Sequence, residues 1–220
     1  MRVIAGSARG RPLKGPRGPG TRPTSDKVKG AIFSMLESLL ASVKTLPAEG
    51  VAPERPGPSE AEAARPEEGV WSGLRVLDLY AGTGALGIEA LSRGAAWADF
   101  VDVSSACVRL IRENLRVTGL ADRARVVCAS VPQVLGRPRD FGLEGPYDVV
   151  LLDAPYGDPT LEPSLETLAR SGLLAANALV VVEHSRRFTP ADAYDGLHLI
   201  RRRRHGDTEV SIYLLSTLSA

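Results

Sequence analysis

Short apolar runs and amphipathic stretches alternate along most of the chain. Runs such as residues 147–153, apolar on both faces, are typical of strands in the middle of a parallel sheet. Between these runs, apolar residues recur every three to four positions, as they do on one face of a helix. The pattern predicts strands at residues 75–79, 100–102, 125–128, 147–153 and 178–183, and helices at 85–93, 104–118 and 161–171.

The end of the chain has a different, two-residue periodicity. Residues 197–203 and 209–215 alternate on either side of Gly206-Asp207, which predicts an antiparallel hairpin. The strand–helix alternation before it implies a doubly wound sheet with helices on both faces. We therefore predict an α/β fold with a mostly parallel, seven-stranded, Rossmann-like sheet and a terminal antiparallel hairpin at one edge.

Two segments of different character precede this alternation. Residues 25–43 have apolar positions at helical spacing and predict an amphipathic helix. Its candidate N-caps are Thr24, Ser25 and Asp26. Residues 47–72 contain five prolines, six glutamates and almost no large apolar residue, so they cannot bury a core. We expect a basic arm and helix at 1–46, a flexible acidic linker at 47–72 and the main domain at 73–220.

The composition is that of an ordinary folded protein. Hydrophobic residues make up 44% of the 220 and charged residues 24%, which excludes wholesale disorder. No apolar run reaches the roughly 18 residues of a membrane span, and the N-terminus lacks an apolar core of secretory length. The two cysteines form no CxxC pair, and the three histidines show no ligand spacing. We therefore expect a cytoplasmic protein that needs no membrane and no metal.

Positive charge is concentrated in two places, although the net charge is only +1. Residues 1–30 contain eight basic residues and one acid, and residues 201–204 are consecutive arginines. Such patches are typical of proteins that bind a polyanion, because phosphates are neutralised locally. A solvated tail would show the same composition. Glycine and proline interleave with the N-terminal cations, which indicates an extended arm and not a basic helix.

Two elements at predicted strand ends suit a nucleotide-type ligand, since parallel sheets bind ligands outside the carboxyl ends of their strands. After the first strand, glycines at 82, 84 and 87 let the backbone approach a ligand and turn into a helix. About 20 residues further on, Asp102 is placed to hold ribose hydroxyls. Asp78 would repel a pyrophosphate but could hold the cationic amino acid end of S-adenosylmethionine. A purely structural glycine turn and a nicotinamide-dependent oxidoreductase remain as alternatives.

The third element is Asp153-Ala154-Pro155-Tyr156, which ends the fourth predicted strand. A nicotinamide-binding fold has no need for an acid and an aromatic residue there, so this element counts against an oxidoreductase. A structural interpretation also exists, in which Asp153 caps a loop and Pro155 is an ordinary turn residue.

These residues resemble known motifs. Residues 78–84 (DLYAGTG) are similar to the first motif of class I S-adenosylmethionine-dependent methyltransferases, and residues 153–156 resemble the [N/D]PP[Y/F] signature of enzymes that methylate exocyclic amino groups. More specifically, the chain resembles the bacterial family that methylates guanine N2 in 16S ribosomal RNA. That resemblance lies in residues 1–6 with 9–11, 21–28, 77–95 and 204–208.

The resemblance implies methyl transfer from S-adenosylmethionine to 16S ribosomal RNA, free or within an assembling small subunit, by a monomer. S-adenosylhomocysteine would be the product. The implied catalytic residues are Asp153, Ala154, Pro155 and Tyr156. The implied cofactor-binding residues are Asp78, Tyr80, Ala81, Gly82, Gly84, Asp102 and Ser130. In the basic arm, the expected phosphate contacts are Arg9, Arg11, Arg17 and Arg22.

Two positions depart from the family pattern. Ala154 stands where the family has proline, but the backbone carbonyl that this position is thought to supply is retained. Ser130 stands where such enzymes often place an aspartate near the adenine, and its hydroxyl can still form a hydrogen bond. Two further functions stay open: an adenine-N6 or protein-glutamine methyltransferase on the same fold, and a catalytically silent RNA-binding protein of ribosome assembly.

Overall fold

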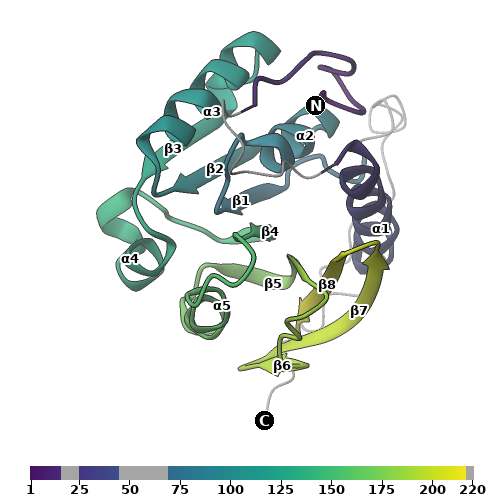
Figure 1. Cartoon of the computed structure of the whole chain (residues 1–220), viewed down its shortest axis with the longest axis vertical. Helices are drawn as coiled ribbons and strands as arrows, with labels where there is room; N and C mark the ends of the chain where they lie inside the picture. The colour runs from purple at the N-terminus through teal and green to yellow at the C-terminus, as the bar shows by residue number, and fades with distance from the viewer. Residues whose placement is uncertain (16–24, 45–68, 217–220) are drawn as a thin grey trace, which may run out of the picture.

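The computed structural model describes residues 1–15, 25–44 and 69–216. Their strands form one mixed sheet in the order β3-β2-β1-β4-β5-β8-β7-β6, parallel from β3 to β5 and antiparallel beyond (Figure 1). The strands are β1 (Arg75–Leu79), β2 (Trp97–Asp102), β3 (Ala124–Cys128), β4 (Tyr147–Asp153), β5 (Leu174–Ser185), β6 (Ala193–Tyr194), β7 (Leu197–His205) and β8 (Thr208–Leu215). The α-helices are α1 (Asp26–Lys44), α2 (Ala85–Arg93), α3 (Ser105–Thr118), α4 (Val131–Gly136) and α5 (Leu161–Arg170).

The sheet differs from the predicted one at its edge. The sequence predicts seven strands, whereas the described residues form eight. The extra strand, β6, has two residues and pairs with β7, so it is too short to show a periodicity. The pattern also does not predict α4, because six residues cover fewer than two helical turns. The other elements lie where the pattern places them, with shifted ends.

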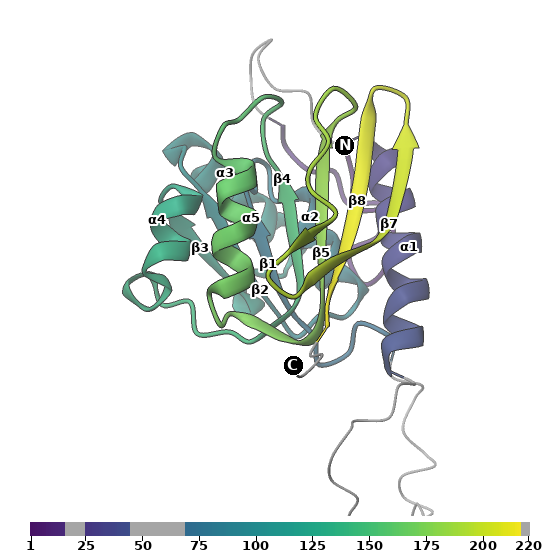
Figure 2. The ribbon, with the colours of Figure 1, turned by 90° about the horizontal axis from the view of Figure 1, so that it is seen from below.

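Helices cover both faces of the sheet. One face packs against α1, α2 and α3, through side chains such as Ile32, Ile88 and Ile111. The opposite face packs against α4 and α5, through Val134 and Leu165. Both views show these two helical layers, with α1 beside the β7–β8 hairpin (Figures 1 and 2). The doubly wound arrangement predicted from the sequence is confirmed. In the described part of the chain, no helix is long and apolar enough to cross a membrane.

The first 15 residues, called here the N-terminal arm, are part of the folded body. Val3, Ala8 and Leu13 are buried in the core that α1 and α2 share. At the C-terminal end of α2, the Ser7 N–H donates to the Ser92 carbonyl at 2.7 Å, and the Ala8 N–H donates to Ser92 Oγ at 3.0 Å. The described part of the predicted basic arm, residues 1–15, therefore lies along the domain.

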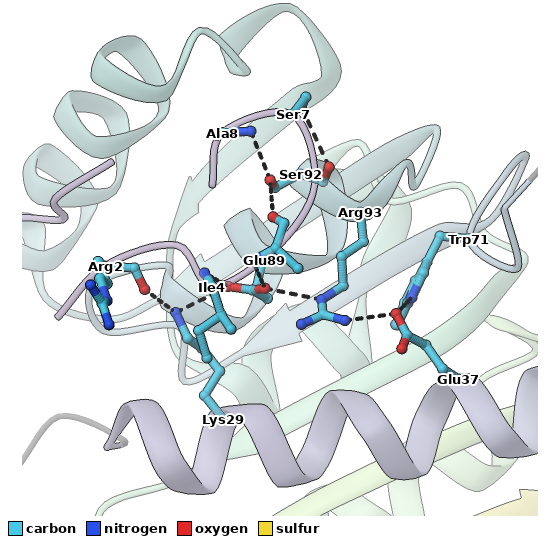
Figure 3. Close-up of polar contacts among 11 residues, drawn as sticks. Arg2, Ile4, Ser7, Ala8, Lys29, Glu37, Trp71, Glu89, Ser92 and Arg93 are labelled. Carbon is cyan, nitrogen blue, oxygen red and sulfur yellow. Dashed lines mark hydrogen bonds and ion pairs between the residues drawn. The ribbon is translucent and has the colours of Figure 1, made fainter. Parts of the chain in front are cut away.

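A buried carboxylate joins the N-terminal arm, α1 and α2 (Figure 3). The Ile4 and Ala5 N–H groups donate to Glu89 at 2.8 and 2.9 Å. The Lys29 ammonium lies 3.2 Å from the same carboxylate, and both of these side chains are fully buried. Arg93 Nε donates to Glu89 at 3.0 Å. This network fixes the start of α1 relative to α2.

The predicted linker at 47–72 is described only from residue 69 onward. Its end is packed, because Trp71 is buried with its ring centroid 5.3 Å from that of Phe33 in α1. The Trp71 indole N–H donates to Glu37 at 3.3 Å. The packed body therefore includes Trp71, which precedes the predicted domain boundary at residue 73.

Candidate active site

The carboxyl ends of the central strands open into one cavity of about 1250 Å³. The start of α1 and the β7–β8 hairpin complete its wall. The cavity brings together all the predicted catalytic residues and every predicted cofactor residue except Gly84. These are Asp153, Ala154, Pro155, Tyr156, Asp78, Tyr80, Ala81, Gly82, Asp102 and Ser130.

The turn between β1 and α2 presents its backbone to this cavity. Tyr80, Gly82 and Gly84 all adopt left-handed backbone angles, with φ of 58°, 55° and 74°. Gly84 is the N-cap of α2, and a Cβ there would lie 3.2 Å from the Ile111 side chain. Gly84 therefore shapes the turn from behind and does not line the cavity. The Tyr80 hydroxyl lies 2.8 Å from Thr160 Oγ1, which anchors the turn next to α5.

Asp78 is a buried carboxylate in the cavity wall. It is 1% exposed and accepts a hydrogen bond from the Gly87 N–H at 2.8 Å. Burial raises the pKa of Asp78 well above its ordinary value, the Gly87 hydrogen bond lowers it, and the charges of Asp153 and Asp102 raise it further. An anion in this setting is stabilised by a cationic ligand.

No group of three or more His, Cys, Asp and Glu among the described residues could hold a metal ion.

Asp102, at the end of β2, is held by two backbone donors. The Gly82 N–H donates to Oδ2 at 2.7 Å, and the Ser104 N–H donates to Oδ1 at 2.8 Å. Each oxygen keeps acceptor capacity for ligand hydroxyls, as ribose binding requires.

Ser130 is the N-cap of α4, and its hydroxyl donates to Gln133 Oε1 at 2.9 Å. The Ser130 oxygen can still accept a hydrogen bond from a ligand in the cavity.

The Asp153–Tyr156 segment leaves β4, the neighbour of β1 in the sheet, and lines the same cavity. Ala154 is buried, whereas Tyr156 is 51% exposed. The Tyr156 hydroxyl lies 2.6 Å from Thr208 Oγ1, at the start of β8. This contact joins the segment to the β7–β8 hairpin and fixes the outer end of the ring. An exposed aromatic ring held in this way offers a stacking surface to a planar base.

Several parts of the cavity wall were not assigned a role from the sequence. Three of them are Ser25, Lys27 and Val28 of the first turn of α1 and its cap, Glu183 of β5, and His205, Gly206 and Thr208 of the hairpin. Arg204, which also lines the cavity, belongs to the arginine run expected to bind a polyanion. The first and third parts fall in stretches 21–28 and 204–208, which carry the family resemblance, so a signal was present. Glu183 follows an apolar run as a single acid, and only the sheet register shows that it pairs with Asp153.

The arginines predicted to contact RNA are only partly described. Arg9 and Arg11 are exposed on the N-terminal arm. The Arg11 guanidinium donates to the Val117 carbonyl, near the C-terminal end of α3, at 2.7 Å. Arg17 and Arg22 lie outside the described residues. The contacts of the arm with the domain thus hold Arg11 in an exposed position.

The arginines of the run on β7 have different surroundings. A register shift between Leu199 and Arg201 interrupts the pairing with β8 just before the run, and from Arg201 to Arg204 the pairing is regular. Arg202 turns toward the protein and donates to Ser211 Oγ at 3.2 Å and to the Pro190 carbonyl at 3.0 Å. Arg204, by contrast, lines the cavity. One arginine of this run therefore stabilises the hairpin and another reaches the candidate site.

The sheet order, the glycine turn after β1 and the acid after β2 together define a class. They form the Rossmann-like fold of class I S-adenosylmethionine-dependent methyltransferases, with the ligand cavity at the carboxyl ends of the strands. Within that class, the chain belongs to the family described as Conserved hypothetical protein 95, which matches residues 1–48 and 63–214.

Individual relatives cover nearly the same length. YlbH of Bacillus subtilis (strain 168) is 33% identical over 97% of this chain and 98% of its own length. The protein named ribosomal RNA small subunit methyltransferase D of Escherichia coli (strain K12) is 31% identical over 83% of this chain and 74% of its own length. The solved structure of YhhF from Escherichia coli covers 98% of both chains, with a TM-score of 0.73 and 27% sequence identity.

Proposed function

We propose that this protein transfers a methyl group from S-adenosylmethionine to the exocyclic N2 of a guanine in small-subunit (16S) ribosomal RNA. The observation that carries the proposal is that Asp78, Gly82 and Asp102 line one cavity together with the Asp153–Tyr156 segment. A methyl donor held by the first group would meet an amine held by the second. The name of the Escherichia coli relative, which is 31% identical, supports small-subunit ribosomal RNA as the substrate.

The donor side of the cavity fits a ligand with a cationic group and ribose hydroxyls. Burial and neighbouring carboxylates raise the pKa of Asp78. A ligand ammonium group that donates a hydrogen bond to Asp78 would supply the missing counter-charge. Asp102 presents a carboxylate already oriented by the Gly82 and Ser104 N–H groups. Ser130 would accept a hydrogen bond at the adenine end. When bound, S-adenosylmethionine supplies an electrophilic methyl group on a sulfonium.

The acceptor side addresses the weak nucleophilicity of an aromatic amine, whose lone pair is delocalised into the ring. The Asp153 carboxylate and the Ala154 carbonyl would accept its two N–H groups and favour a pyramidal nitrogen with an outward lone pair. The N–C bond forms as the C–S bond breaks, and Asp153 takes the proton that the methylated nitrogen releases. Tyr156 would stack on the base, which must first leave its helical stack. Positioning then supplies most of the rate.

Positive side chains around the cavity would bind the RNA backbone. Lys27 and Arg204 are exposed and line the cavity, and Arg9 and Arg11 are exposed on the N-terminal arm. Such cations neutralise phosphates and orient the nucleic acid without reading its sequence. We expect a monomer in the cytoplasm, because one chain supplies both sides of the cavity and ribosomal RNA is its substrate.

Mass mapping of small-subunit ribosomal RNA from cells that lack the protein tests this proposal. We expect the loss of one N2-methylguanine, restored by the wild-type gene and by Asp158→Asn, but not by Asp153→Ala. Asp158 also lines the cavity, but its carboxylate accepts from the Thr160 N–H at 2.8 Å, a contact that asparagine can keep. The Asp153→Ala protein should bind S-adenosylhomocysteine with nearly wild-type affinity in a calorimeter. An active Asp153→Ala enzyme, or a lost methyl group on adenine, would contradict the proposal.

A further inference from the structure

We infer that Glu183, near the C-terminal end of β5, selects guanine by accepting a hydrogen bond from N1–H of the target base. The inference rests on the proposed function, because it concerns the base whose amine Asp153 would hold. It makes Glu183 a specificity-determining residue, with a task separate from that of Asp153.

The sheet places these two carboxylates next to each other. Asp153 and Glu183 are paired residues in the parallel register of β4 and β5. Paired residues of neighbouring parallel strands lie about 5 Å apart and point to the same face of the sheet. Both side chains line the cavity, and Glu183 is only 6% exposed. The cavity thus offers two adjacent carboxyl groups as hydrogen-bond acceptors at its acceptor side.

Strand register places the Glu183 side chain on the face of the sheet that also carries Thr208. His184, the next residue, faces the other side of the sheet, where its Nε2 lies 2.9 Å from Ser211 Oγ. On β8, Val210 pairs with Glu183, and Thr208 lies two residues away on the same face. Thr208 is the residue that holds the Tyr156 hydroxyl. The stacking surface and the two carboxylates are therefore neighbours.

Guanine and adenine differ in what they present to such a pair. The Watson–Crick edge of guanine carries neighbouring donors, the N2 amine and N1–H, whereas adenine has an amine beside N1, an acceptor. Two carboxylates match the first pattern, since each accepts one donor. They disfavour adenine, because a carboxylate oxygen would then lie against the lone pair of N1 with no hydrogen between the two acceptors. A site built on buried acceptors discriminates strongly against a substrate that lacks the matching donor.

A base analogue separates the Glu183 contact from the methylated amine. 2-Aminopurine keeps the amine of guanine but has an acceptor at N1. The probe is a fragment of small-subunit ribosomal RNA that carries guanine or 2-aminopurine at the mapped position. For wild-type enzyme we expect kcat/KM to be about 10- to 100-fold lower for 2-aminopurine, the effect of losing a hydrogen bond to a charged acceptor.

The nearly isosteric variant Glu183→Gln should weaken this preference, because its amide can donate to the N1 acceptor. We expect a roughly 10-fold loss on guanine and no loss on 2-aminopurine, and therefore a guanine-to-2-aminopurine ratio of kcat/KM about 10-fold lower than that of wild type. Asp158→Asn, a change at another carboxylate of the cavity wall, should keep the wild-type ratio. Thermal melts and S-adenosylhomocysteine binding check the fold of each variant. If Glu183→Gln does not fold, Glu183→Asp should give a ratio between the wild-type value and one.

Each outcome has a distinct meaning. A wild-type enzyme that forms no N2-methylguanine overturns the proposed function and this inference with it. A wild-type enzyme that forms N2-methylguanine but treats both bases alike overturns only the role of Glu183. A Glu183→Gln enzyme, or in its place a Glu183→Asp enzyme, that keeps the wild-type ratio does the same.

Discussion

Removal of one partner from the buried Lys29–Glu89 pair should destabilise the protein by an amount that depends on which partner is removed. Loss of one member of a buried ion pair costs about 3–5 kcal/mol, because the other charge remains buried. After Lys29→Met, Glu89 keeps the Ile4 and Ala5 N–H groups and Arg93 as donors. We therefore expect the lower end of the range, about 3 kcal/mol.

Glu89→Gln should cost more, about 5 kcal/mol. The change leaves the Lys29 ammonium fully buried, and its other acceptor among the described residues is the Arg2 carbonyl, at 2.6 Å (Figure 3). Urea unfolding followed by circular dichroism measures both free energies. The double variant Lys29→Met with Glu89→Gln should be destabilised by less than the sum, because the two changes share one interaction. Hydrogen exchange at the Ile4 and Ala5 amides reports the contacts of the arm directly.

Three results would refute this reasoning. One is a Lys29→Met variant within about 0.5 kcal/mol of wild type, the range of ordinary surface substitutions. Another is additive behaviour of the double variant, which would mean that the two side chains do not interact in solution. The third is an equally large effect at an exposed lysine on the same helix, Lys27→Met, which would show that the loss comes from helix charge and not from the pair.

Three further perturbations test the cavity. Asp78→Asn should weaken S-adenosylmethionine binding roughly 10-fold in calorimetry. It should also stabilise the ligand-free protein at pH 7, because burial raises the pKa of Asp78, so that Asp78 contributes stability at low pH and loses it as pH rises through the folded-state pKa. Gly87→Ala should cost about 2 kcal/mol in urea, since its Cβ would overlap the Phe100 ring and lie 3.0 Å from Asp78. Thr208→Val should raise KM for RNA several-fold by releasing Tyr156.

Each of these predictions has its own control. The melting temperatures of wild type and Asp78→Asn, measured between pH 4 and pH 8, should converge at the acidic end. A constant difference across this range would contradict a raised pKa of Asp78. Gly136→Ala, at the end of α4 with open space around its Cβ, should leave stability nearly unchanged. Thr208→Ser, which keeps a hydroxyl, should have a KM for RNA close to that of wild type. If Thr208→Val weakens cofactor binding instead, Thr208 acts on the cofactor and not on the base, which contradicts the prediction.

Elements long enough to show a clear hydrophobic pattern could be predicted from the sequence. Helix α3 has a cap at Ser104, whose hydroxyl accepts from the Cys107 N–H at 3.4 Å, and ends at Gly119 with φ of 74°. Strand β4 shows the apolar run of a central strand. In contrast, β6 and α4 are too short for any periodicity, and the register shift between Leu199 and Arg201 leaves no mark in the composition.

The candidate site was predictable where its residues are local in sequence. Asp78 and the following glycines form one motif, and Asp153 begins another, so each could be assigned by strand-end logic. The contributions of Thr208 and Glu183 depend on pairing between distant segments. Tyr156 and Thr208 are 52 residues apart, and their contact needs the complete hairpin. No local pattern encodes such pairings, because they follow from the order of strands in the sheet.

The attachment of the N-terminal arm to α2 has a consequence for synthesis on the ribosome. Ile4 and its acceptor Glu89 are separated by 85 residues. The nascent arm must therefore remain outside the exit tunnel, with Val3 and Leu13 open to solvent, until α2 has been translated. Non-local contacts of this kind fold late and expose apolar surface in the meantime. Until α2 emerges, the nascent arm therefore lacks the acceptors on Glu89 and Ser92 that hold it in the folded protein.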